Sequence, residues 1–275
     1  MNDFRSTARK NRAEAAGRRA TGEMTVTITG GRSELGRLLS RQRAKGKVHI
    51  NIAGQQANTL LHDGHAWKGF ARTALAGARR ALRADADMLV HASFAFVLGN
   101  PQKDPLRSIA EAIVECERLV LSGPVPACVV RLGYLYGPDS RDLHAYRKAF
   151  RLGRPYWAGP RKALQYHLHQ QDAVSALLAA AHPRNAGRIL YATDRKPASF
   201  MQFMDDFARR TGRRIPLHVP KIAAPIIKLL VREEHMQQAA LAMPARAPSP
   251  RVPGFKPAFP DYRQGLDQII EAWNA

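Results

Sequence analysis

The sequence predicts an α/β protein in which helices cover both faces of a doubly wound parallel sheet. Short runs of β-branched and aliphatic residues alternate with stretches whose apolar residues recur at helical spacing. The first of these runs ends at a pair of glycines, and a helical pattern follows at once. Strands that are separated by helices imply right-handed crossovers and a parallel sheet. A smaller C-terminal lobe is expected after this sheet.

The elements of the sheet are expected in the first half of the chain. Thr25–Thr29 is a β-branched run, and leucines at helical spacing follow its glycine turn. Later strands are expected at Val48–Gly54, Met88–Ser93 and Ala127–Leu132, and helices at Trp67–Leu82 and Ile109–Leu121.

The composition changes after Pro138, where elements become shorter and proline more frequent. We expect a flexible basic tail over 1–24, a parallel-sheet core over 25–138 and a second lobe over 139–275, with some elements of the lobe interleaved into the core. Helices of the lobe are expected at Phe200–Arg210, Ile222–Ala242 and Gly265–Trp273, and an extended, proline-rich connector at Pro244–Pro253.

The tail and the two cysteines bear on the cellular compartment. Residues 1–24 contain no apolar run, which argues against a secretory signal peptide, and their acidic residues argue against organelle targeting. Cys116 and Cys128 fall on an expected helix and strand, so a disulfide framework is not expected. No apolar stretch approaches the roughly 20 residues of a membrane span. We therefore expect a cytoplasmic protein in a reducing compartment, without a membrane span.

The chain is strongly basic. Its 43 Lys and Arg residues exceed its 22 Asp and Glu residues, which gives a formal net charge of +21. Such a field attracts nucleic acids, acidic proteins, phosphorylated ligands and anionic lipid surfaces alike. Aromatic residues make up only 7% of the chain, and no RNA-binding or zinc-finger spacing is present. We expect solvated basic helix faces and phosphate binding in one cleft.

The turn between the first strand and the first helix is the best-placed candidate for a binding site. In a dinucleotide-binding turn, glycines permit the tight bend, the approach of the pyrophosphate and the packing of the helix on the strand. The outer two positions are Gly30 and Gly36, whereas Ser33 holds the middle one. Phosphate would meet the N–H groups at the start of the helix.

Six segments, taken in order, resemble motifs of the extended short-chain dehydrogenases, the NAD(P)-dependent epimerase and dehydratase family. The segments are Thr29–Gly36, Val48–Gly54, Val90–Gly99, Arg131–Pro138, His169–Ala173 and Gly254–Pro257 with Gly265 and Leu266. They resemble the family's TGxxGxxG turn, its cofactor-side strand, its hxSSxxVYG, RxxNVYGP and HVDDxA segments, and its C-terminal closure. The resemblance implies a Rossmann-like dinucleotide-binding core. It places the cofactor against Gly30, Gly31, Arg32, Ser33, Glu34, Leu35, Gly36, Ala53, Gly54 and Ser93.

The resemblance leaves the choice of nucleotide open. If Val48–Gly54 matches the family's fourth strand, the second and third strands are absent. If it is the second strand, no acid follows it to hold a ribose 2′-hydroxyl, which argues against NAD. Arg32 lies where related dehydrogenases hold the 2′-phosphate of NADP, although Glu34 brings a repulsive carboxylate close to the pyrophosphate. We expect NADP rather than NAD, with a protein that binds no cofactor as the alternative.

The family's proton relay is missing at the matching positions. Its Ser or Thr, its Tyr and its Lys correspond to Phe94, Ile109 and Ile113, and none of the seven tyrosines has a lysine four positions later. A tyrosine is a poor base at neutral pH without such a lysine. The catalytic residues are therefore unassigned, and Tyr134 and Tyr166, with His91 and His169, are the candidates for a displaced acid or base.

Three functions remain. The first is a nucleotide-binding accessory or sensor protein, a pseudoenzyme of the family. The second is an NADP-dependent oxidoreductase or epimerase with a displaced acid or base. The third is a basic scaffold for RNA or an acidic protein partner. No metal site is expected, because His167 and His169 supply two ligands where zinc needs three or four. Asp172 is expected to cap the helix that starts beside it, and Cys116 to be a packing residue.

Overall fold

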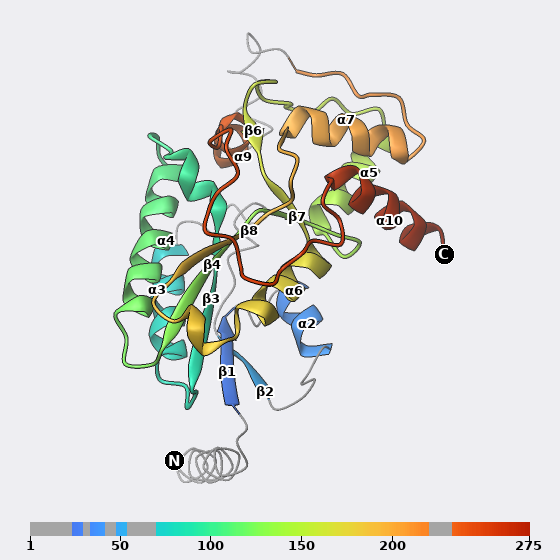
Figure 1. Ribbon diagram of the computed structural model, residues 1–275. Helices are drawn as coiled ribbons and strands as arrows, with labels where there is room; N and C mark the ends of the chain where they lie inside the picture. The colour runs from blue at the N-terminus through green and yellow to red at the C-terminus, as the bar shows by residue number, and fades with distance from the viewer. Residues whose placement is uncertain (1–23, 30–33, 42–47, 54–69, 220–232) are drawn as a thin grey trace, which may run out of the picture.

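A five-stranded parallel sheet forms the centre of the computed structural model, which describes residues 24–29, 34–41, 48–53, 70–219 and 233–275. Its strands are β1 (Met24–Thr29), β2 (Val48–Ala53), β3 (Met88–Phe94), β4 (Ala127–Leu132) and β8 (Ile189–Ala192). They lie in the order β2-β1-β3-β4-β8, and every neighbouring pair is parallel. The expected doubly wound parallel sheet is confirmed (Figure 1).

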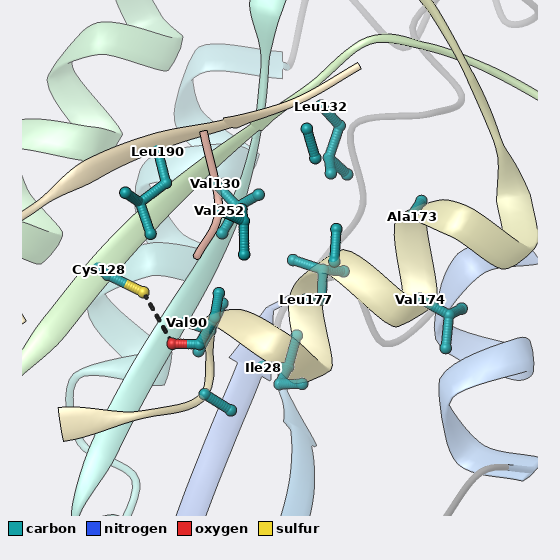
Figure 2. Packing of buried hydrophobic residues seen from close by; sticks show 14 of the residues in the cluster. Ile28, Val90, Cys128, Val130, Leu132, Ala173, Val174, Leu177, Leu190 and Val252 are labelled. Atoms are coloured by element: carbon teal, nitrogen blue, oxygen red, sulfur yellow. Dashed lines mark hydrogen bonds between the residues drawn. The ribbon is translucent and has the colours of Figure 1, made fainter. Parts of the chain in front are cut away.

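Helices cover both faces of this sheet. Helices α2 (Glu34–Arg41) and α6 (Gln170–Ala180) pack on one face, and α3 (Phe70–Ala81) and α4 (Leu106–Leu121) on the other (Figure 1). Alternate strand residues point to the same face, so Ile28, Val90 and Val130 meet Leu177 of α6 in one aliphatic core (Figure 2). Cys128 lies in this core, with its Sγ 3.7 Å from the carbonyl oxygen of Ala180.

Strand β2 settles which of the two alternatives for Val48–Gly54 the chain adopts. Its residues pair with β1 from Met24↔Val48 to Thr29↔Ala53, on the side of β1 away from β3. This is the position of the second strand in the usual dinucleotide-binding order, in which the first strand separates the second from the fourth.

The C-terminal part of the chain builds a second apolar cluster. Helices α5 (Arg141–Arg151), α7 (Phe200–Arg210) and α10 (Tyr262–Asn274) contribute Phe150, Phe207 and Leu266 to it. Two small sheets lie beside it, β5 (Tyr134–Tyr136) with β7 (His167–His169), and β6 (Leu164–Gln165) with β9 (Ala198–Ser199). The remaining elements are the 3-10 turns η2 (Ala95–Gly99) and η3 (Pro183–Asn185) and the helix α9 (Glu233–Ala240).

The expected boundaries that fall on described residues lie within three residues of the observed ones. The bounds of β4 and α7 are those expected, and Ser199 and Gln202 form a capping box at the start of α7. Helix α4 begins three residues before Ile109, because Asp104 accepts a hydrogen bond from the Ser108 N–H at 3.2 Å. Parts of the expected elements lie outside the described residues: 1–23 of the tail, 67–69 of the helix expected at Trp67–Leu82, and 222–232 of the helix expected at Ile222–Ala242.

Asp172 does not cap α6, contrary to expectation. The N-cap is His169, whose Nδ1 accepts from the Gln171 N–H, and Asp172 is already inside the helix. The buried Asp172 carboxylate instead accepts the backbone N–H groups of Ala258 and Phe259 at 2.7 and 3.0 Å. It therefore fastens the C-terminal segment to the sheet core. Among the described residues, no helix is long and apolar enough to cross a membrane.

The packing of α10 on β5 yields a stability prediction. A Cβ added to Gly265 would lie 2.8 Å from Cζ of the buried Tyr136 ring. Gly265→Ala should therefore lower the free energy of unfolding by about 1–3 kcal/mol through overpacking, although alanine is the better helix former. Urea unfolding measures the change. Gln264→Ala, on the exposed side of the same helix, is the matched control and should be neutral or slightly stabilising; equal behaviour of the two variants would refute the close contact.

Candidate functional site

The order of the sheet reverses at β1, and this reversal defines the candidate site. β2 lies on one side of β1 and β3 on the other. Ligands of open α/β sheets bind outside the carboxyl ends of the strands at such a point, because the connections there diverge to opposite faces. Thr29 ends β1, α2 begins at Glu34, and Phe94 ends β3. The chain between Thr29 and Glu34 is the glycine turn, so topology and motif coincide.

Among the described residues, Thr29 and His91 lie at this site, at the carboxyl ends of β1 and β3. The buried Thr29 Oγ1 accepts the Ala92 N–H at 2.9 Å and lies 3.1 Å from His91 Nδ1. Burial lowers the pKa of His91 to about 4, and the charge of Glu117 only partly opposes the shift. His91 is therefore neutral at physiological pH. It cannot serve there as a protonated general acid, so one of the displaced candidates loses its support.

A buried ion pair lies near Thr29 and His91. Arg131 donates to Glu117 from Nε at 2.9 Å and from Nη2 at 2.6 Å, and its Nη1 donates to the Tyr191 hydroxyl at 3.0 Å. Only 2% of the Glu117 side chain and 13% of the Arg131 side chain are exposed. Burial lowers the pKa of Arg131, but the hydrogen bonds and charge of Glu117 outweigh it, and the net pKa is raised. Arg131 is therefore charged.

The side chain of Ser93 contacts this ion pair. Its hydroxyl is fully buried and donates to Glu117 Oε1 at 2.5 Å. Ser93 therefore contributes by fixing the end of β3. The cofactor-side role that the resemblance implies for Ser93 stays a prediction.

The three positions that correspond to the family's proton relay meet in one apolar cluster. Ile109 and Ile113 of α4 are buried there, and Phe94 packs against them. The rings of Phe94 and Phe96 lie 6.2 Å apart. None of these side chains can donate or accept a proton. The structure thus brings the three positions together but leaves them chemically inert.

The segment after α9 closes over this cluster. Gln165 donates to the carbonyl oxygens of Gln238 and Leu241, and the Met243 N–H donates to Leu164 at 2.8 Å. Leu241 and Met243 pack into the apolar cluster. The sequence predicts only an extended connector from Pro244 onward and does not predict this contact, although Leu241 and Met243, two apolar residues before the prolines, are a signal for it.

The remaining displaced candidates also have unsuitable proton affinities. Tyr166 is buried, donates to the Ala245 carbonyl at 2.9 Å and has a pKa raised by burial. Burial raises the pKa of Tyr134 well above its usual value. Burial lowers the pKa of His169 to about 4. All four candidates are thus shifted away from neutral pH, in the direction opposite to the one that acid–base catalysis requires.

The other predicted cofactor residues are only partly described. Gly30, Gly31, Arg32, Ser33 and Gly54 lie outside the described residues, and for Glu34 and Ala53 only the secondary structure is described. Leu35 and Gly36 are buried in α2, with Leu35 in the sheet core. The Leu35 side chain therefore packs against the sheet rather than facing a ligand.

Asp194, just beyond β8, is a buried acid that sequence reasoning missed. It has no exposed surface, its Oδ1 accepts the His167 N–H at 3.2 Å, and its Oδ2 has no partner among the described residues. Burial raises its pKa to about 9. Burial also lowers the pKa of His167 to about 3. No described group of three His, Cys, Asp or Glu side chains could hold a metal ion.

The raised pKa of Asp194 makes stability depend on pH above neutrality. The folded protein holds this proton up to about pH 9, whereas the unfolded chain releases it near pH 3.9. The free energy of unfolding should therefore fall by about 1.4 kcal/mol per pH unit between about pH 7 and pH 9. Asp194→Asn, which resembles the neutral acid, should abolish this slope in urea unfolding. A slope that persists in the variant would show that Asp194 is ionised in the folded protein. Below about pH 6.5 the buried histidines give the opposite slope.

No protein-family model matches this chain. A curated relative, the 3-diazoavenalumate denitrifying reductase of a Streptomyces species, is 32% identical over 158 residues, which is 56% of this chain and 51% of the relative. The chain thus spans about half the length of that relative.

Two solved structures illustrate the structural likeness. The human epimerase family protein SDR39U1 (isoform 2) with NADPH has a TM-score of 0.68 at 15% identity and covers 90% of this chain and 99% of its own. The UDP-glucuronic acid 4-epimerase of Bacillus cereus, in complex with UDP-glucuronic acid and NAD, has a TM-score of 0.64 at 12% identity and covers 91% and 100%. Such identities establish the architecture alone. The chain has the fold of the extended short-chain dehydrogenases, the NAD(P)-dependent epimerases and dehydratases.

Proposed function

We propose that this protein binds NADP(H), in preference to NAD(H), at the carboxyl ends of β1 and β3 and acts as a reductase that supplies no proton to its substrate. The observation that carries the proposal is the coincidence of the glycine turn with the reversal of strand order at β1. The likeness to structures solved with NADPH or NAD supports the same ligand class.

The residues around the reversal fit a dinucleotide as far as they are described. The buried Thr29 ends β1 with its hydroxyl fixed by Ala92, and α2 begins five residues later with its N-terminus at the same edge. The N–H groups at a helix start suit a pyrophosphate. His91 is neutral and adds no charge there. Arg32 is the residue we assign to the 2′-phosphate, and this assignment is the basis of the preference for NADP.

The apolar cluster limits the substrate. A bound, reduced nicotinamide would supply a hydride. Reduction of a carbonyl also needs a proton at the developing alkoxide, and Phe94, Ile109 and Ile113 offer none. We infer that the acceptor is already electron-poor or cationic, so that it takes a hydride without a proton. The apolar cluster would then position the acceptor and exclude water.

An arenediazonium cation meets this requirement. The curated relative is called a denitrifying reductase of a diazo compound. An arenediazonium cation and one hydride give the arene and dinitrogen, so atoms and charge balance without a proton. An arenediazonium cation is therefore the substrate class that we assign to this site.

A second function is favoured by the segment that closes the cluster. Leu241 and Met243 fill the apolar site, and a Cβ on Gly99 would lie 2.6 Å from Leu241 Cγ. Such a closed arrangement suits an accessory or sensor protein that binds the nucleotide and performs no turnover. Nucleotide binding is common to both functions, and turnover separates them.

Thermal unfolding with each nicotinamide nucleotide tests binding. NADPH and NADP should raise the melting temperature, since a ligand of the native state alone stabilises it, and Gly30→Asp should abolish the shift. Arg32→Ala should weaken NADPH binding by about tenfold or more, the worth of a charged hydrogen bond, and leave NADH binding unchanged. An equal shift by all four nucleotides would contradict the preference for NADP, and no shift at all would overturn the site.

Isotope transfer tests turnover independently. With NADPH deuterated on one face of the nicotinamide and a benzenediazonium salt, we expect deuterium in the arene from one face only. Gly30→Asp and an enzyme-free sample are the controls, since spontaneous reduction is not stereospecific. Nucleotide binding without stereospecific deuterium transfer would contradict the reductase proposal and favour the accessory function.

A further inference from the structure

An apolar and basic surface lies on the C-terminal lobe, formed by two segments, 151–156 and 213–219. Within the described parts of the chain, four large hydrophobic side chains are strongly exposed, and three of them lie in these segments: Leu152 at 55%, Ile215 at 43% and Leu217 at 75%. The fourth, Val114 at 46%, lies on α4. We call the two segments together the lobe surface.

The two segments are held side by side. Tyr156 donates its N–H to the Leu217 carbonyl at 3.2 Å, and its own carbonyl accepts the Val219 N–H at 3.1 Å. These bonds form a parallel bridge between Tyr156 and His218. Behind the bridge, the rings of Phe150 and Phe207 lie 6.2 Å apart and join α5 to α7. The exposed residues therefore stand on one backbone framework.

Their exposure is not the result of a loose backbone. The Leu152 N–H donates to the carbonyls of Lys148 and Ala149 at 3.3 and 3.1 Å, and the Arg154 N–H donates to Ala149 at 3.0 Å. The Arg213 N–H likewise donates to Ala208 at 3.0 Å. Fixed turns thus hold these side chains outward, where water contact is unfavourable.

The charge on this surface has one sign. Arg151, Arg154, Arg213 and Arg214 are exposed, and none of them forms a salt bridge within the described residues. The stretches 143–171 and 207–219 contain no Asp or Glu at all. The nearby acids Asp205 and Asp206 are already engaged, by Tyr156 and His218 and by Arg209, Tyr262 and Arg263. This surface therefore presents uncompensated positive charge.

We propose that the lobe surface docks this protein on an anionic lipid bilayer, with Leu152, Ile215 and Leu217 entering the acyl boundary and the four arginines meeting lipid phosphates. Exposed aliphatic side chains beside exposed arginines in the same segments match this boundary, where apolar groups enter the acyl region and charged groups stay among the headgroups. A single-stranded nucleic acid would call for exposed aromatic platforms, and the exposed side chains here are aliphatic.

The segment after α7 lies apart from β1 and β2, and in Figure 1 it crosses the opposite end of the molecule. The inference concerns where the protein works and goes beyond the reaction proposed for it.

Cosedimentation of the full chain with vesicles tests the proposal. Vesicles of phosphatidylcholine with about a third of phosphatidylserine should bind the protein, pure phosphatidylcholine should not, and added salt should weaken the binding. Arg213→Glu with Arg214→Glu should lower the partition coefficient by about tenfold or more, since each basic residue near the bilayer contributes roughly a factor of five. Leu217→Ser should lower it by about fivefold or more through the lost apolar contact.

Matched variants separate this surface from the overall charge. Arg79→Glu with Arg80→Glu changes the net charge equally on α3, and Val114→Ser removes an exposed aliphatic residue on α4. Both should bind vesicles nearly as the parent does, and melting temperatures check that every variant is folded. Equal loss in the α3 variant would overturn the proposal in favour of diffuse attraction. Binding to a short RNA or a polyglutamate peptide that is tighter than binding to vesicles, and unaffected by Leu217→Ser, would overturn it as well.

Discussion

The buried ion pair between Glu117 and Arg131 is the constraint on which the site edge depends. One carboxylate accepts from Ser93 on β3 and from two nitrogens of Arg131 on β4, while Arg131 reaches Tyr191 on β8. Helix α4 is thereby fixed to three neighbouring strands. Removing either charge would leave the other buried and unpaired, which typically costs about 3–5 kcal/mol. The Ser93 hydroxyl donates its hydrogen bond to Glu117 of this pair.

Helix α4 also contributes Ile109 and Ile113 to the apolar cluster. Glu117 lies four residues after Ile113 and eight after Ile109, so the three recur at nearly the same face of α4. One end of that face binds the ion pair, and the other packs against Phe94 and Met243. Because the ion pair fixes α4 to the sheet, the apolar cluster keeps its position without a polar group at the positions of the family's Tyr and Lys. This division explains how the architecture persists although its proton relay is absent.

Much of this could be predicted from local sequence. Alternation of β-branched runs with helical patterns identified β1, β3, β4 and α7 because each is specified by its own residues. Contacts between distant segments could not be predicted in that way. Asp172 binds the backbone more than eighty residues later, and the cover at Leu241 and Met243 closes on η2 and β6. Likewise the neutral state of Asp194 arises from burial, which no motif records.

Burial explains why chemistry and charge lie in different parts of this molecule. Charge removed from water must be paired, as in Glu117 and Arg131, or neutralised, as in Asp194 and His167. A net charge of +21 therefore has to reside mainly on the surface. On the lobe surface, aliphatic side chains are also exposed. In water alone the arginines there are hydrated, but the aliphatic side chains stay in unfavourable contact with water. An interface with an anionic, partly apolar partner satisfies both.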